Sequence, residues 1–342
     1  MSILVTGATG FIAAHCIDQL LKNGHSVVGT IRSPQKGAAL EAVFPEAVAS
    51  KKLILEIVSD IRSAEEFDKL FDKHPEIGKV LHTASPFHFN IKDPIKDMLE
   101  PAVEGTNTVL QSVLKHAPQV TKVVVTSSFV SMLTADDLFD PSVTVTEKSW
   151  NRITWEQGAG NVEVLTYFAS KKFAEKAAWD FVENEKPFFT LTTVNPSLVF
   201  GPSITKPDLK SLNTSNADIV THALEAKDSD KDIGQYNSFC VDVRDVAKGH
   251  VVALDEKTDG KRLMLCSNKF CSQRLLNYIN EDFPELKGKI AVGNPDQVEE
   301  IEAKTFQFDN TETKKLLGFE FTPLRETIDD FVAQWLEARK EQ

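Results

Sequence analysis

The sequence predicts an α/β protein built around a doubly wound parallel sheet, and three observations support this. A short apolar run at residues 3–5 leads directly into a glycine-containing turn and then into an amphipathic helix. Further apolar runs of strand length recur along the chain, at 27–31, 53–58, 80–81, 123–125 and 191–194. Helical patterns separate several of these runs, as expected when crossover helices connect parallel strands.

The turn after the first strand has the residues that a dinucleotide-binding turn requires. Gly7 permits a tight turn, Gly10 lets the backbone approach a pyrophosphate, and Ala13 keeps the following helix close to the sheet. The phosphates would lie at the helix N-terminus, where unpaired N–H groups and the helix dipole favour negative charge. The residues of this turn predicted to contact the cofactor are Gly7, Thr9, Gly10, Phe11 and Ile12.

Composition restricts the classes of partner. The 342-residue chain carries 38 basic and 50 acidic side chains, and the resulting net charge of −12 argues against nucleic acid or a membrane surface as a partner. The four cysteines lack CxxC pairing and metal-ligand spacing, so we expect no metal and reduced thiols in a cytoplasmic protein. No apolar run approaches the roughly 20 residues of a membrane-spanning helix, and we expect no signal peptide.

The ends of the second and third strands indicate which dinucleotide binds. Enzymes that use NAD usually have an acidic residue after the second strand, whereas a basic residue accommodates the 2′-phosphate of NADP. Arg32 and Lys36 therefore predict NADP(H); the alternative is that both are ordinary surface charges. Asp60 and Ile61 are predicted to contact the adenine, and the alternative for Asp60 is a helix N-cap.

Small residues follow the fourth strand, where a cofactor would lie across the sheet. The segment 82–87 reads HTASPF, and its Ala84 is predicted to contact the cofactor. His82, at the start of the segment, is interpreted as a packed histidine without a chemical role. This segment therefore adds a cofactor contact but no catalyst.

One serine, one tyrosine and one lysine form the candidate catalytic set. The fifth strand ends in Ser127 and Ser128, and a helix expected from about 166 to 184 carries Tyr167 and Lys171 on one face. Hydride transfer to a carbonyl leaves an alkoxide, so an acid must lie nearby. Tyr167 is the predicted acid, Lys171 lowers its pKa and can reach the nicotinamide ribose, and Ser128 hydrogen-bonds the substrate oxygen. The alternative is a core aromatic beside a surface lysine.

Together these motifs resemble the extended short-chain dehydrogenase/reductase family. The matching segments span most of the chain, at 6–13, 82–86, 126–128, 167–171, 195–202 and 242–247. The sequence is most similar to the dihydroflavonol-reductase-like branch, particularly to fungal NADPH-dependent methylglyoxal and aldehyde/ketone reductases. The segments that carry this closer match are 171–179, 212–215, 280–284 and 313–319.

The resemblance implies roles for further residues. It implies a Rossmann-type fold, in which Tyr167 and Lys171 contact the cofactor as well as the substrate. It also places cofactor contacts at Pro196, Val199 and Ser215. The sequence departs from the family pattern at two places: an alanine replaces the third glycine of the turn, and the catalytic asparagine of the family has no clear counterpart.

The second half of the chain is predicted to form a smaller α/β substrate domain. We expect residues 1–190 to form the dinucleotide-binding domain and residues 191–342 most of the substrate domain, with a return to the first domain near 235–260. Residues 206–232 are interpreted as a polar lid, and a last helix over 324–338 should pack its apolar stripe into a core. Four apolar residues are predicted to line the substrate pocket: Phe87, Phe129, Leu133 and Val164. Core packing is the alternative for Leu133 and Val164.

These features favour an NADPH-dependent carbonyl reductase that acts on a small aldehyde or ketone. Apolar pocket walls suit carbonyls with hydrocarbon substituents better than phosphorylated sugars. A nucleotide-sugar epimerase of the same fold and a catalytically silent NADP-sensing protein are the alternatives. The sequence leaves the oligomeric state open, with a homodimer as one candidate.

Overall fold

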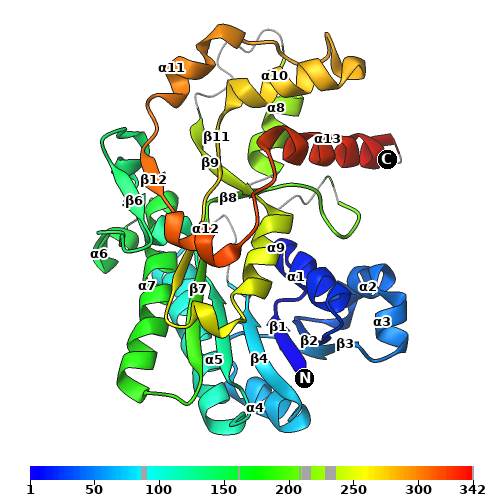
Figure 1. Cartoon of the computed structure of the whole chain (residues 1–342), viewed down its shortest axis with the longest axis vertical. Coiled ribbons are helices and arrows are strands. Elements are labelled where there is room, and N and C mark those ends of the chain that lie inside the picture. Colours follow the sequence, from blue (N-terminus) through cyan, green and yellow to red (C-terminus); the bar gives the residue numbers. More distant parts are fainter. Residues whose placement is uncertain (86–90, 161, 208, 210–216, 228–235, 341–342) are drawn as a thin grey trace.

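The largest element of the fold is a seven-stranded parallel sheet (Figure 1). The computed structural model describes residues 1–85, 91–160, 162–207, 209, 217–227 and 236–340. The strand order is β10-β7-β5-β4-β1-β2-β3. The strands are β1 (Ser2–Thr6), β2 (Ser26–Ile31), β3 (Leu53–Ile57), β4 (Ile77–His82), β5 (Lys122–Thr126), β7 (Thr190–Pro196) and β10 (Arg262–Leu265). The order reverses between β1 and β4, which is where sheets of this kind bind ligands.

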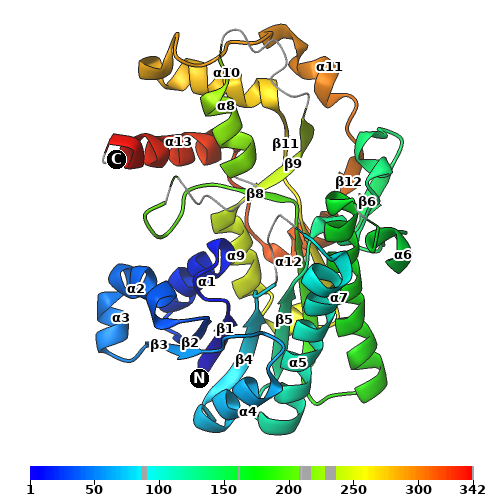
Figure 2. The same ribbon diagram turned by 180° about the vertical axis from the view of Figure 1, so that it is seen from behind.

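Helices cover both faces of this sheet, as predicted. Side chains of α1 (Phe11–Lys22) and α9 (Val243–Val252) belong to the apolar cluster on one face, and those of α4 (Ala64–Lys73), α5 (Glu100–His116) and α7 (Glu163–Glu185) to the cluster on the other (Figure 2). Residues of β1 alternate between the clusters: Ile3 and Val5 join the first and Leu4 the second. A strand buried on both faces is apolar throughout, and this produces the uninterrupted runs in the sequence.

A second, smaller part of the chain lies beyond the carboxyl ends of the large sheet (Figure 1). It contains a three-stranded sheet of order β11-β9-β8, formed by β8 (Leu198–Phe200), β9 (Asn237–Asp242) and β11 (Asn268–Cys271). The helices around it are α8 (His222–Glu225), α10 (Ser272–Asp282), α11 (Val298–Glu302) and α13 (Leu324–Lys340). The apolar stripe of α13, which includes Phe331 and Trp335, is buried in this core, so the sequence interpretation of that helix is confirmed.

The remaining elements are short. They are α2 (Pro34–Val43), α3 (Pro45–Ala49), α6 (Trp155–Gly158), α12 (Thr311–Leu317) and a two-stranded parallel sheet of β6 (Thr144–Thr146) and β12 (Gln307–Asp309). Single helical turns occur at Ile95–Leu99, Phe129–Ser131, Asp136–Phe139, Ala217–Thr221, Glu256–Thr258, Pro284–Leu286 and Pro295–Gln297. Within the described ranges, no helix combines the length and apolar character needed to cross a membrane.

The two parts of the chain are interleaved. After β9, helix α9 packs against α1, and β10 then pairs with β7 at the edge of the large sheet. The division near residue 190 stays a prediction. Two local expectations differ from the structure: α7 begins at Glu163 rather than near 166, and the N-cap of α4 is Ser63, whose side chain accepts a hydrogen bond from Glu66 N, rather than Asp60.

Candidate active site

The β1–α1 turn lies against the end of β4 because a glycine occupies its tightest point. Gly7 has a φ of +67°, and a Cβ built there would lie 3.1 Å from both the Cα and the Cβ of Ala84. Its N–H donates to Thr30 Oγ1 at 3.0 Å, and Ala84 N donates to Thr6 Oγ1 at 3.0 Å. Three parallel strands are thereby joined at their carboxyl ends, around the predicted cofactor turn.

The N-terminus of α1 is suited to an anion. Its N-cap is Gly10, and its first turn contains no acidic residue. Thr9 and Gly10 are exposed, whereas Phe11 and Ile12 are partly buried. The 12-residue helix therefore presents its N–H groups and the positive end of its dipole without a competing side-chain carboxylate.

The side chains expected at the adenosine end lie at the ends of β2 and β3. Arg32 and Lys36 are both exposed. Asp60 accepts three side-chain hydrogen bonds from Arg62, with Nη2 to Oδ2 at 2.7 Å and Nε to both Oδ1 and Oδ2 at 3.1 Å. This bonding to Arg62, together with the nearby charge of Arg32, lowers the pKa of Asp60. Ile61 packs against α5, where a Cβ at Gly105 would lie 2.5 Å from its Cδ1.

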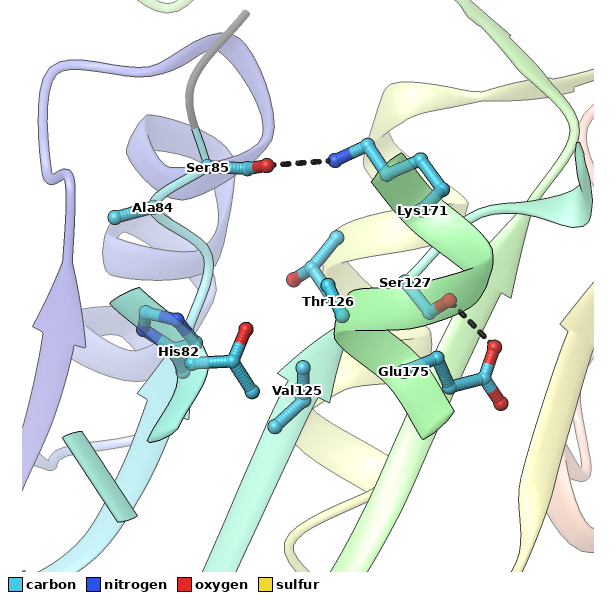
Figure 3. A pocket seen from close by; sticks show the side chains of 10 residues that line it. His82, Ala84, Ser85, Val125, Thr126, Ser127, Lys171 and Glu175 are labelled. Atoms are coloured by element: carbon cyan, nitrogen blue, oxygen red, sulfur yellow. Dashed lines mark hydrogen bonds between the residues drawn. The ribbon is translucent and has the colours of Figure 1, made fainter. Parts of the chain in front are cut away.

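The structure brings Ser128, Tyr167 and Lys171 together at the carboxyl end of β5. Ser128 follows that strand, is 8% exposed and forms a side-chain hydrogen bond with Tyr167. Tyr167 and Lys171 lie one helical turn apart on α7, with Lys171 Nζ 5.9 Å from the centre of the Tyr167 ring. Lys171 Nζ also donates to Ser85 Oγ at 3.0 Å, which connects α7 with the segment after β4 (Figure 3).

The pKa values of this set differ from the expectation in one respect. Burial raises the pKa of the Tyr167 phenol, and the hydrogen bond with Ser128 opposes that effect. The expected lowering of this pKa by Lys171 is not what the structure shows, because burial dominates. Burial also lowers the pKa of Lys171 to about 8, so part of the lysine population is neutral in mildly alkaline solution.

A small cavity of about 10 Å³, lined by polar and apolar groups, lies beside Lys171 on the side of α7 that faces β4 and β5 (Figure 3). Its volume suits one water molecule. The lining residues are His82, Ala84, Ser85, Thr106, Val125, Thr126, Ser127, Lys171, Ala174 and Glu175. Helix α5 thus contributes Thr106 to the lining, whereas Asn107, which lies near the position of the family's catalytic asparagine in the sequence, is not among the lining residues.

His82 has the structural role expected of it. Its ring Nδ1 lies 2.9 Å from Thr6 Oγ1, and its side chain is buried beneath the cofactor turn. Burial, together with the charge of Lys171, lowers the pKa of His82 to about 4, so the ring is neutral at physiological pH. The packing of this ring agrees with the interpretation drawn from the sequence.

The predicted substrate contacts are dispersed. Phe129 and Leu133 are buried in one apolar cluster, in which Phe129 stacks on Phe306 with the ring centres 5.3 Å apart. Val164 is 50% exposed near the start of α7, which excludes core packing for it. Phe87 lies outside the described residues, as does the predicted cofactor contact Ser215, and 13 of the 27 residues of the predicted lid are likewise not described.

The two remaining predicted cofactor contacts lie on consecutive strands that belong to different sheets. Pro196 ends β7 and is buried, and Val199 on β8 is 8% exposed. Val199 packs in the same apolar cluster as Ala13 of α1. Among the described residues, no group of histidine, cysteine and acidic side chains has an arrangement that would hold a metal ion, and all four cysteines are free and buried.

Comparison with known proteins assigns the chain to a family. The model of the NAD dependent epimerase/dehydratase family matches residues 3–266. The chain belongs to this family. The assignment agrees with the resemblance to extended short-chain dehydrogenases/reductases, and the epimerase/dehydratase family model covers the glycine turn, the Ser-Tyr-Lys set and β10.

Relatives of this family member match over nearly their whole length. An NADPH-dependent methylglyoxal reductase of Saccharomyces cerevisiae is 42% identical, with 98% of each chain covered. A ketoreductase of Aspergillus niger is 39% identical, with 98% of this chain and 97% of that protein covered. The crystal structure of yeast methylglyoxal/isovaleraldehyde reductase complexed with NADPH superposes with a TM-score of 0.94 at 42% identity, covering 100% of both chains.

Sequence reasoning missed several polar residues that surround the candidate catalytic set of this epimerase/dehydratase family member. Ser85 binds Lys171, whereas Glu175, Asn195 and Arg262 form a buried network behind Ser128. One signal in the sequence pointed to Glu175: it follows Lys171 by four residues and therefore shares the inward face of α7. No local pattern pointed to Arg262, which lies 87 residues further along the chain.

Proposed function

We propose that this protein is an NADPH-dependent carbonyl reductase that converts aldehydes and ketones, including methylglyoxal-type, aliphatic and aryl carbonyls, to alcohols. The observation that carries the proposal is the convergence of Ser128, Tyr167 and Lys171 beside the β1–α1 turn. The names of the reductase relatives from yeast and Aspergillus niger support the same activity.

The residues present fit an NADP(H) molecule. A side chain at Gly7 would collide with Ala84, and the glycine N-cap of α1 leaves the helix N-terminus open to a pyrophosphate. Arg32 and Lys36 are exposed, as required to reach the 2′-phosphate. The further contacts proposed are Thr9, Phe11, Ile12, Asp60, Ile61, Ala84, Pro196, Val199 and Ser215. When bound, the cofactor supplies the hydride.

Each catalytic residue has a distinct role in the proposed reaction. Ser128 hydrogen-bonds the carbonyl oxygen and polarises it. Tyr167 is protonated at neutral pH because burial raises its pKa, and it donates that proton to the oxygen as negative charge develops. Lys171 holds the cofactor ribose and, when charged, stabilises the phenolate that Tyr167 becomes.

We also propose the cytoplasm as the compartment and a homodimer as the assembly. Four free, buried cysteines fit a reducing compartment. Sedimentation of the purified protein tests the assembly, since a sedimentation coefficient of a monomer would contradict it.

The decisive experiment mixes the purified protein with NADPH and a panel of carbonyls that includes methylglyoxal, isovaleraldehyde and aryl ketones. We expect loss of NADPH absorbance with at least one of them. Tyr167→Phe should slow turnover by about 10²-fold or more while NADPH binding, measured by calorimetry, stays unchanged. NADPH binding without turnover of any carbonyl would favour the sensing alternative, and a Tyr167→Phe variant of wild-type activity would refute the assigned general acid.

A further inference from the structure

A buried carboxylate lies directly behind the catalytic set. The Glu175 side chain has no exposed surface, and it forms an ion pair with Arg262, whose Nε lies 2.6 Å from Oε1. Burial acts to raise the pKa of Glu175, but Arg262 and the hydrogen bonds from Ser127 and Ser131 outweigh it and lower the pKa below its ordinary value. Glu175 is therefore an ion at neutral pH, surrounded by donors.

Glu175 lies on the face of α7 that carries the proposed catalytic residues. It follows Lys171 by four residues and Tyr167 by eight, so all three side chains lie on one side of the helix. Figure 3 shows Glu175 one turn below Lys171, with its carboxylate directed toward Ser127. The same helix face therefore carries the proposed acid Tyr167, then Lys171, then the Glu175 carboxylate.

The donors to Glu175 also hold the backbone of Ser128. Asn195 Nδ2 donates to Glu175 Oε2 at 2.7 Å, to Ser131 Oγ at 3.0 Å and to the carbonyl oxygen of Ser128 at 3.3 Å. Ser131 Oγ lies 2.7 Å from that same carbonyl oxygen and shares its single proton between it and Glu175. Ser127 Oγ donates to Glu175 at 2.6 Å. The segment 127–131 is therefore attached to α7 at several points.

A second set of contacts anchors the anion from the opposite side. Arg262 belongs to β10, and its Nη1 donates to the carbonyl oxygen of Glu147 at 3.0 Å. Its guanidinium stacks over Trp150, 4.0 Å from the ring centre. Because Arg262 is fixed by these contacts, the Glu175 carboxylate has a fixed position between β10 and the segment 127–131.

We propose that Glu175 is a positioning residue that fixes Ser128 relative to Tyr167 and Lys171, a role that depends on the proposed catalytic function of those three residues. Catalytic groups must be held to within about 0.5 Å for full rate, and hydroxyl orientation depends on the backbone that carries it. Glu175 connects the two separate elements that supply the groups, α7 and the segment after β5, through one buried charge.

The experiment compares four single substitutions in the full-length protein: Ser131→Ala, Trp179→Phe, Ser128→Ala and Glu175→Gln. Ser131→Ala removes the hydroxyl shared by Glu175 and the Ser128 carbonyl. Trp179→Phe is the matched control, because Trp179 Nε1 donates to Glu175 Oε1 at 3.2 Å on the side away from Ser128. Ser128→Ala reports on the proposed function itself. For each, kcat and KM for a reduced carbonyl, the dissociation constant of NADPH and the melting temperature are measured.

We expect Ser131→Ala to lower kcat about tenfold, with KM and NADPH affinity unchanged, because a misplaced Ser128 weakens stabilisation in the transition state more than substrate binding. Trp179→Phe should keep kcat within about twofold of wild type even if its melting temperature falls as far as that of Ser131→Ala. Glu175→Gln, which keeps the size but removes the charge, should lower kcat at least as much as Ser131→Ala. Glu175→Gln also leaves Arg262 without its ion-pair partner. For that reason Ser131→Ala, and not Glu175→Gln, is the deciding variant.

Two outcomes separate failure of this inference from failure of the proposed function. A wild-type kcat for Ser131→Ala beside an inactive Ser128→Ala would overturn the positioning role alone. Equal losses of kcat in Ser131→Ala and Trp179→Phe would also overturn it, because a general loss of stability would then explain both. Full activity of Ser128→Ala would overturn both the catalytic assignment and this role.

Discussion

At the scale of single residues, Lys171 is under two opposing influences. Its ammonium group lies near the Tyr167 ring and donates to Ser85, yet the surrounding protein excludes enough water to lower its pKa to about 8. A lysine of this pKa changes charge near physiological conditions, which suits a group that assists a proton donor.

The lowered pKa of Lys171 predicts a pH dependence of stability. Between about pH 8 and the ordinary value of 10.5, the unfolded chain binds a proton that the folded chain has released, so the free energy of unfolding rises with pH across this window. Lys171→Met removes that contribution. In urea unfolding, the free energy of unfolding of wild type minus that of Lys171→Met should increase from pH 8 to 10.5. A constant difference would contradict the lowered pKa of Lys171.

Arg32 is predicted to determine cofactor preference. Arg32→Ala should raise KM for NADPH about tenfold or more and leave KM for NADH nearly unchanged, because only NADPH has the 2′-phosphate. Lys69→Ala is a matched control, since Lys69 is an exposed cation that pairs with Glu65 on α4. Equal effects of Arg32→Ala on both cofactors would show that Arg32 does not bind the phosphate.

At the scale of elements, the β1–α1 turn depends on close approach as well as on backbone conformation. Gly7 and Gly24 both have positive φ, +67° and +79°, but a Cβ at Gly24 would meet no atom within 4 Å, whereas one at Gly7 would touch Ala84. The two glycines therefore allow the cost of backbone strain to be separated from the cost of a collision.

Gly24→Ala is expected to cost about 1 kcal/mol of stability from strain alone. Gly7→Ala should cost more than Gly24→Ala and should also weaken NADPH binding, because the added methyl group pushes the turn away from β4. Thermal melts and calorimetric titration of both variants measure these effects. Unchanged NADPH affinity in Gly7→Ala would exclude the turn from the cofactor site.

The contact between α10 and α13 brings acidic side chains together. Burial and the neighbouring Asp282 raise the pKa of Asp329 to about 6 from 3.8. The folded chain therefore binds a proton more tightly than the unfolded chain between these values, and the free energy of unfolding falls as pH rises through this window.

Asp329→Asn is expected to stabilise the protein at pH 7 by on the order of 1 kcal/mol, after allowance for partial exposure, and to have no effect at pH 4. Asp330→Asn is the control, because it removes an ion pair with Arg244 and should not stabilise at either pH. Melting temperatures of both variants at pH 4 and pH 7 test these expectations. A gain for Asp329→Asn at pH 4 as well would point to a cause other than its charge.

At the scale of the whole molecule, the sheet and the smaller part depend on each other. His15 of α1 hydrogen-bonds the carbonyl oxygen of Pro202 at 2.8 Å, and Arg244 of α9 forms an ion pair with Asp330 of α13 at 2.5 Å. A ligand at the carboxyl ends of β1 and β4 should therefore stabilise the whole chain, rather than a single domain.

NADPH at one hundred times its dissociation constant should raise the free energy of unfolding by about 2.7 kcal/mol, by mass action. A single thermal transition that moves to higher temperature with NADPH concentration is the expected result. NADH at the same concentration serves as the control and should produce a smaller shift. Two separate thermal transitions, of which only one moves with NADPH, would contradict the mutual dependence of the large sheet and the smaller part.

Much of the fold was predictable because its determinants are local. The buried strands of the large sheet appear as apolar runs, and the helices between them show amphipathic repeats. Tyr167 and Lys171 share a face through helix geometry alone, and the candidate site followed from them and Ser128. Among the unpredicted elements, β6 and β12 have three residues each, too few for a periodic pattern.

The sequence alone determined the strand, turn and helix at the N-terminus, the basic residue after β2 and the spacing of tyrosine and lysine, because each depends on neighbours within a few residues. Only the tertiary structure decided which distant groups meet: Ser85 with Lys171, Arg262 with Glu175, and Phe129 with Phe306 in a packed cluster. Such contacts arise when packing brings remote segments together. The spacing from Lys171 places Glu175 on the inward face of α7, but only the tertiary structure supplies the partners that make it a buried ion rather than a solvated one.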